Sequence, residues 1–178
     1  MAEQLKTVGY ATGIIRQWHL GYPQNSEDDH PQNHGFNEFV GYDRGNIDFV
    51  SPVGDHLPHN WWHGRVNPPE EGDATDLINR YAVEFIDRHY DRPFCRYVPH
   101  LAIHNRGQVR DDPAQRAEQA WKRRRPANDQ ERIENFAACC GRSTKGLGKS
   151  SKRCQGTGST TPPDAFPRGH PPPANPVS

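Results

Sequence analysis

The clearest pattern in the chain is an amphipathic stripe over residues 75–90. Apolar side chains recur there at helical spacing, and charged side chains occupy the opposite positions. Thr75 is a suitable N-cap residue, and Pro93, which follows the stripe, cannot continue a helix. The pattern therefore predicts a helix over residues 75–90, and its apolar face carries Leu77, Ile78, Tyr81, Ala82, Phe85 and Ile86.

Two short apolar runs, residues 10–15 and residues 94–98, have the length of buried strands. Gly9 can adopt the left-handed conformation that ends a helix, so residues 2–8 are predicted to form a helix before the first strand. The second run follows the amphipathic helix directly, an order typical of α/β proteins. Arg96 lies within this run. Because a buried charge is costly without a partner, we expect either an edge strand or a loss of sequence constraint there.

The remaining segments show weaker patterns. Residues 22–72 are rich in Pro, Gly, Asn, Asp and His and are expected to be mostly loop, whereas residues 128–138 are expected to start a further helix. From Cys139 onward Gly, Ser, Thr, Lys and Pro dominate, and such a composition does not offset the entropy cost of ordering. We therefore expect a domain over residues 1–138 and a tail over residues 139–178 that is either disordered or translated in a shifted reading frame.

Composition limits the size of the core and the class of partner. Only 32% of the 178 residues are hydrophobic, and the mean hydropathy is −1.03, so we expect the chain to be part of a larger core. Its 22 acidic and 22 basic residues cancel, which gives no general attraction to nucleic acid or membranes. No apolar run has the length of a transmembrane helix, and the first residues lack a signal-peptide pattern, so localisation stays undetermined. The four cysteines lack zinc or disulfide spacing and are expected to be free thiols.

Polar side chains follow both predicted strands. Gln17 and His19 come after the first strand, and His100 and His104 come after the second. Ligands of open α/β sheets bind at the carboxyl ends of the strands, so these positions are candidates for a functional site. A lone histidine in such a position is more often a hydrogen-bonded surface or core residue, so the spacing alone assigns no function.

Residues 9–19 resemble the second signature of the formylglycine-dependent sulfatases, Gly-Tyr-x-Thr-x-x-Ile-Gly-Lys-x-x-His. Two positions differ, because Arg16 stands where the family has Gly and Gln17 where it has a catalytic Lys. The resemblance continues in the family's order through residues 34–39, 75–86 and 92–105, and it covers residues 2–137 in all. It implies an incomplete alkaline-phosphatase-like α/β domain.

The resemblance also implies a chemistry, the hydrolysis of small-molecule or carbohydrate sulfate esters with calcium as cofactor. By position, His19 matches the signature histidine that contacts the formylglycine, and His104 matches the loop histidine near the leaving group. These two are the expected catalytic residues. Gln17 is the expected substrate-binding residue, since its uncharged amide can still hydrogen-bond sulfate, and His100 is expected to be structural.

Parts of the family's apparatus are missing from the sequence. The nucleophile motif, Cys/Ser-x-Pro/Ala-x-Arg, is absent, as are the acid pair and the acid–Asn motif that supply calcium ligands in the family. We therefore expect a fragment of a sulfatase that is inactive alone. The frame-shift hypothesis depends on residues 144–153, which can be encoded so that the neighbouring frame specifies an amphipathic helix like that of sulfatases at this point.

Two alternative functions are suggested by other residues. His56, His59 and His63 have spacings that would align them on one helical face, as in a non-catalytic zinc-binding module, but Pro58 would break that helix. A basic run over residues 121–125 would suit a nucleic-acid contact, but acidic residues surround it and a solvated helix face is favoured. We expect no nucleic-acid or membrane partner, and the oligomeric state is left open.

Overall fold

The fold is built on a four-stranded sheet in which one buried strand is parallel to both of its neighbours. The computed structural model describes residues 1–23, 25–45, 47–50, 60–101 and 128–156. In chain order its elements are α1 (Ala2–Thr7), β1 (Ala11–Ile15), the 3-10 turns η1 (Glu27–Asp29) and η2 (Pro31–His34), β2 (Glu38–Gly41), β3 (Trp62–His63), α2 (Ala74–His89), β4 (Phe94–Tyr97) and α3 (Asp129–Gly156). The sheet order is β3-β2-β1-β4, with β1 parallel to both of its neighbours and β3 antiparallel to β2.

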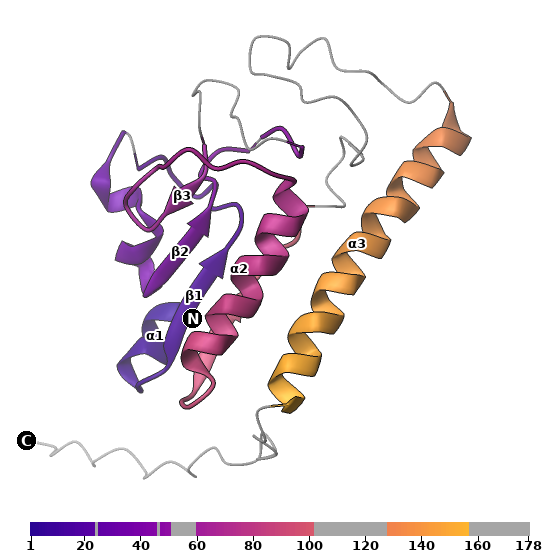
Figure 1. The fold of residues 1–178 in the computed structure, drawn as a ribbon. Helices are drawn as coiled ribbons and strands as arrows, with labels where there is room; N and C mark the ends of the chain where they lie inside the picture. The colour runs from indigo at the N-terminus through magenta and orange to yellow at the C-terminus, as the bar shows by residue number, and fades with distance from the viewer. Residues whose placement is uncertain (24, 46, 51–59, 102–127, 157–178) are drawn as a thin grey trace, which may run out of the picture.

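The central strand is buried on both faces, as its continuous apolar run requires. Successive side chains of a strand point to opposite faces. Ala11 and Ile15 accordingly join the core cluster that includes the apolar stripe of α2. Ile14 instead packs with Ala2 of α1 and with Trp18. Figure 1 shows the resulting layers, with α1 on one face of the sheet and α2 on the other, and α3 lying alongside α2.

Several sequence predictions are confirmed by these elements. The helix ending before Gly9, the first strand, the amphipathic helix and the second strand are all present within a residue or two of the expected bounds. Among the described strands β4 is at the edge of the sheet, as expected from Arg96, and the Arg96 guanidinium donates a hydrogen bond to the carbonyl of Ala82. Three cysteines, Cys95, Cys139 and Cys140, are free thiols.

Other predictions are corrected. The N-cap of α2 is Asp73 rather than Thr75, because Asp73 Oδ1 accepts hydrogen bonds from the backbone N–H groups of Thr75 at 2.9 Å and Asp76 at 3.2 Å. The described part of segment 22–72 is mostly loop, as expected, but it also contains two short strands and two 3-10 turns that the sequence analysis did not identify. These elements have two to four residues each, too few to display a period in the sequence.

The expected disorder from Cys139 onward is wrong for residues 139–156, which continue α3 as a helix. The physical reason is docking on α2. Arg142 Nη1 lies 2.9 Å from Asp73 Oδ2, Arg142 Nη2 donates to Thr75 Oγ1 at 2.9 Å, and Cys139 is buried. Tertiary contacts thus support a segment with low intrinsic helix propensity. Residues 157–178 lie outside the described residues, and the frame-shift hypothesis stays a prediction.

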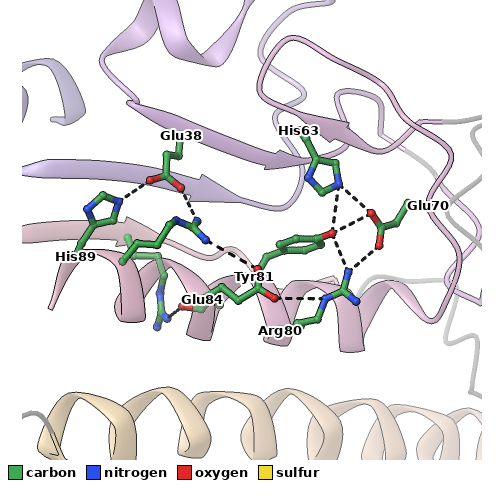
Figure 2. A network of polar contacts seen from close by, with 10 residues as sticks. Glu38, His63, Glu70, Arg80, Tyr81, Glu84 and His89 are labelled. Atoms are coloured by element: carbon green, nitrogen blue, oxygen red, sulfur yellow. Dashed lines mark hydrogen bonds and ion pairs between the residues drawn. The ribbon is translucent and has the colours of Figure 1, made fainter.

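Two carboxylates tie α2 to neighbouring strands and loops (Figure 2). Glu70 lies 2.7 Å from Arg80 Nη2 and 2.9 Å from His63 Nε2, and it accepts a hydrogen bond from the Tyr81 hydroxyl at 2.9 Å. Burial alone would raise the pKa of Glu70, but the hydrogen bonds from these three groups outweigh it and lower that pKa. The carboxylate form of Glu70 therefore stabilises the fold, and this contribution is lost as the pH falls below the ordinary value of 4.5.

Glu38 is the second carboxylate that links α2 to the sheet. It lies at the start of β2 and contacts Arg88 Nη2 at 2.6 Å and His89 Nε2 on the last turn of α2. Burial again opposes ionisation, but the hydrogen bonds from Arg88 and His89 lower the pKa of Glu38. Together the two carboxylates link both halves of α2 to the β2–β3 side of the sheet.

Gly13 permits the close approach of α2 to β1. A Cβ atom at this position would lie 2.4 Å from Cε2 of Phe85, which is itself fully buried. We predict that Gly13→Ala lowers the free energy of unfolding by about 1–3 kcal/mol, the usual cost of overpacking a filled core. Denaturant unfolding followed by circular dichroism measures this change. Gly141→Ala is the matched control, because nothing lies within 4 Å of its added Cβ, and it should be neutral or stabilising. Equal losses in both variants would contradict the packing argument.

His100 is predicted to make the free energy of unfolding depend on pH above the range in which Glu70 acts. Burial, followed by the charges of Arg16 and Arg142, lowers the pKa of His100 from 6.5 to about 4. As the pH falls from 6.5 toward 4, the unfolded chain gains a proton that the folded chain does not, so stability falls through this window. His100→Gln should flatten this part of the curve.

Ser143→Ala is the control for His100→Gln. It removes the contact between the Ser143 hydroxyl and His100 Nδ1 at 3.1 Å but leaves the titrating ring in place. It should lower stability at every pH without changing the slope between pH 6.5 and 4.5. Urea unfolding at a series of pH values distinguishes the variants, and an unchanged slope in His100→Gln would refute the assignment.

Candidate functional site

A cleft of about 570 Å³ opens where β1 ends. Its polar lining includes Arg16, Gln17 and His19 from the segment that leaves β1, His34 from η2 and Tyr97 from β4. Its apolar lining includes Ala2, Ile14, Trp18 and Phe36. The last four also form the core cluster under α1, so the cleft rests on a packed base. The site therefore combines a rigid apolar base with a rim of cationic and hydrogen-bonding groups.

The backbone of this segment adopts conformations that glycine favours. Arg16 has a φ of 141° and His19 a φ of 49°, both in the left-handed half of the map. Such residues cost about 1–3 kcal/mol each and persist only where the surroundings hold them. Here the hydrogen bonds Trp18 N–H to Tyr42 O at 2.8 Å and His19 N–H to Asp43 O at 3.1 Å supply that restraint.

Two glycines, one at the end of β2 and one in the loop after it, leave space for this turn. A Cβ atom at Gly41 would lie 2.0 Å from the carbonyl oxygen of Arg16, and one at Gly45 would lie 2.7 Å from Cε1 of His19. Both glycines therefore allow the loop after β2 to press against the end of β1. The placement of the His19 ring depends on this contact.

The structure brings two of the predicted site residues together. Gln17 Nε2 lies 3.3 Å from His19 Nδ1 and donates a second hydrogen bond to the carbonyl of Arg44, also at 3.3 Å. An amide nitrogen only donates, so this contact requires an unprotonated Nδ1 and puts the proton of the neutral ring on Nε2. The third predicted residue, His104, lies outside the described residues, and its position relative to His19 stays a prediction.

Arg16 is a site residue that the sequence reasoning missed. It was noted only as a departure from the family's glycine, yet its side chain lines the cleft and its Nε donates to the Tyr42 hydroxyl at 3.4 Å. Burial raises the pKa of Tyr42 to about 12 despite the opposing charge of Arg16, so Tyr42 stays a neutral partner. The signal that would have identified Arg16 is its charge directly beside the polar pair that follows β1.

The end of β4 adds His100, which the sequence reasoning treated as structural. His100 Nε2 lies 3.2 Å from Asn79 Oδ1 and Nδ1 lies 3.1 Å from the Ser143 hydroxyl, so both ring nitrogens have partners on the two long helices. The lowered pKa of His100 keeps the ring neutral. Its contacts thus fit the structural role.

The proposed histidine metal site gains no support from the described residues. His63 is engaged by Glu70 and Tyr81 (Figure 2), while His56 and His59 lie outside the described residues. Within residues 1–23, 25–45, 47–50, 60–101 and 128–156, no three or more His, Cys, Asp or Glu side chains are grouped so as to hold a metal ion. The described residues thus offer no cluster of carboxylates for calcium. None of the described helices is both long enough and apolar enough to cross a membrane.

Comparison with known proteins agrees with the resemblance seen in the sequence. A sequence model of the sulfatase family matches residues 1–150. The chain is 32% identical over 121 residues to an arylsulfatase of Hemicentrotus pulcherrimus, covering 58% of this chain and 21% of that protein. It is 43% identical over 54 residues to the human steryl-sulfatase, covering 29% of this chain and 9% of that protein. The chain thus spans about a fifth of the arylsulfatase and less of the steryl-sulfatase.

Solved structures extend the likeness to the fold. The crystal structure of Ps i-CgsB superimposes with a TM-score of 0.69 at 20% identity, over 88% of this chain and 36% of that one. It has also been solved in complex with k-i-k-neocarrahexaose. The Bacteroides fragilis protein yidJ gives a TM-score of 0.55 at 17% identity, over 88% of this chain and 40% of that one. The predicted alkaline-phosphatase-like α/β fold, present here in part, is confirmed. Because the family match covers most of its length, the chain belongs to the sulfatase family.

Proposed function

We propose that this chain is part of a sulfatase that hydrolyses sulfate esters of small molecules or carbohydrates, and that the cleft at the end of β1 binds the sulfate group. The observation that carries the proposal is the convergence of Arg16, Gln17 and His19 on one cleft of about 570 Å³. These residues lie within the stretch that matches the sulfatase family. A cation and the Nε2–H donor of His19 suit a tetrahedral anion, while both amide hydrogens of Gln17 are used on His19 and Arg44.

Each residue has a distinct role in the proposed site. The guanidinium of Arg16 supplies positive charge and hydrogen bonds to sulfate oxygens. The Nε2–H of His19 donates to negative charge that develops at the reacting centre, and Gln17 holds the opposite ring nitrogen. His104 is proposed as the acid that protonates the leaving oxygen, a role that follows from its match to the family's loop histidine.

The nucleophile is not among these groups. Sulfatases of this family use a formylglycine made from a Cys or Ser in a motif that the given sequence does not contain. The acid pair and the acid–Asn motif that supply calcium ligands in the family are likewise not found in the 178 residues. We infer that the chain binds the sulfate group but needs residues outside this sequence for turnover.

Sulfate binding should depend on Arg16. We expect Arg16→Gln to weaken the binding of 4-nitrophenyl sulfate by roughly 10- to 100-fold, because hydrogen bonds to charged groups contribute about 1.5–3 kcal/mol. Titration calorimetry or chemical shifts of the His19 ring measure the affinity. Arg132→Gln is the matched control, since Arg132 is an exposed cation on α3 away from the cleft. Equal affinity in the two variants, or no binding to the parent chain, would count against the proposal.

Turnover gives a separate test. We predict that the chain alone releases no 4-nitrophenol from 4-nitrophenyl sulfate above the rate of a His19→Ala, His104→Ala double variant. The reason is the missing nucleophile, without which the covalent route is closed. Absorbance at the nitrophenolate band measures product. Activity that the double variant abolishes would show that this chain contains a working nucleophile.

A further inference from the structure

A second concave surface lies between α2 and α3, away from the cleft. It has a volume of about 590 Å³. We call it the basic groove, and its side chains are Asp76 and Asn79 from α2 and Arg142, Lys145, Lys149 and Lys152 from α3. Figure 1 shows the two helices side by side. The cleft, by contrast, rests on the core cluster under α1, on the opposite face of the sheet.

The cations of the basic groove follow helical spacing. Residues 142, 145, 149 and 152 are three or four positions apart and share one face of α3. Arg142 is held by Asp73 at 2.9 Å. The three lysines are exposed, and none has an ion-pair partner among the described residues. Like charges at this spacing destabilise a helix, so the row has a cost in the free chain that a bound anion would relieve.

Glycines keep the groove open between these charges. Gly146 and Gly148 also line it and add no side chain. A Cβ atom at Gly146 would lie 1.7 Å from Asn79 Oδ1, so α3 approaches α2 closely at that point. The groove thus has a fixed wall, carrying polar groups, opposite a flexible row of ammonium groups.

We propose that the basic groove binds a sulfated carbohydrate chain at a site separate from the cleft. The three lysines, which have no ion-pair partner among the described residues, suit sulfate groups spaced along a polymer, whereas the amide nitrogen of Asn79 suits a sugar hydroxyl. Among the described residues its lining includes no aromatic side chain on which a base would stack. Sulfated carbohydrate as the ligand class rests on the proposed function, but the groove itself does not.

The separation of the two sites sets the expected behaviour. A polymer held in the basic groove raises the local concentration of sulfate esters at the molecule without touching the cleft. Loss of the lysines should therefore weaken binding of a long sulfated chain and leave binding of a small aryl sulfate unchanged.

The test compares two triple variants of the full chain. Lys145→Gln, Lys149→Gln and Lys152→Gln together remove three charges from the groove, and Lys6→Gln, Arg65→Gln and Arg132→Gln together remove three exposed charges elsewhere. The probe is a sulfated galactan hexasaccharide, with its desulfated form and a single-stranded DNA of equal charge alongside. We expect the groove variant to lose on the order of tenfold in affinity for the sulfated probe, as for a few exposed ion pairs. It should also lose most of the salt dependence, and the control variant should lose neither.

The outcomes separate the two proposals. Equal loss in both triple variants, equal binding of the desulfated probe, or tighter binding of the DNA would overturn the groove assignment. Circular dichroism checks that α3 is retained, and salt dependence of the parent chain gives a readout that needs no variant. If the sulfated probe depends on the three lysines while 4-nitrophenyl sulfate binds independently of Arg16, the groove stands and the proposed cleft function fails. The reverse result retains the cleft and removes the groove.

Discussion

The contact between Gly13 and Phe85 sets the geometry on which the rest of the structure depends. Because Gly13 has no side chain, the ring of Phe85 packs directly against the backbone of β1, and the strand is buried on both faces. A fully buried central strand has little freedom to shift along its length or rotate. The segment after its last residue is therefore held in a fixed place at the carboxyl end of the sheet, between the loops after β2 and β4.

The backbone that follows β1 adopts conformations that few residue types favour. The positive φ angles at Arg16 and His19 are stabilised by hydrogen bonds to the chain after β2 and by the space that Gly41 and Gly45 leave. The φ of Arg16 is one that glycine adopts at no cost, and the sulfatase signature has glycine at this position. Arg16 therefore carries the strain of a side chain at a backbone conformation that suits glycine.

Much of this arrangement follows from local sequence signals. The buried strand is visible as a short continuous apolar run, and α2 is long enough to show the helical period. The positions of Gln17 and His19 follow once the strand end is known. What the sequence does not reveal depends on partners distant along the chain. β2 and β3 are too short to show a period, and α3 beyond Cys139 has a composition typical of disorder but gains order by docking Arg142 on the N-cap of α2. Likewise the role of His63 is decided by Glu70 and Tyr81, which no spacing rule connects to it.

The substitution pair Arg16 and Gln17 moves the positive charge of the site by one residue along the chain. A Coulomb interaction at an effective dielectric of about 20 falls from about 4 kcal/mol at 4 Å to about 2 kcal/mol at 8 Å, so attraction for a divalent sulfate or a monovalent ester survives a shift of a few ångströms. A hydrogen bond does not survive such a shift, because it weakens steeply with distance and angle. Contacts made only in the transition state demand that precision, whereas ground-state binding does not. In the proposed site, the exchange of the signature's Gly–Lys pair for Arg16–Gln17 therefore preserves the binding of sulfate better than it preserves the rate of its transfer.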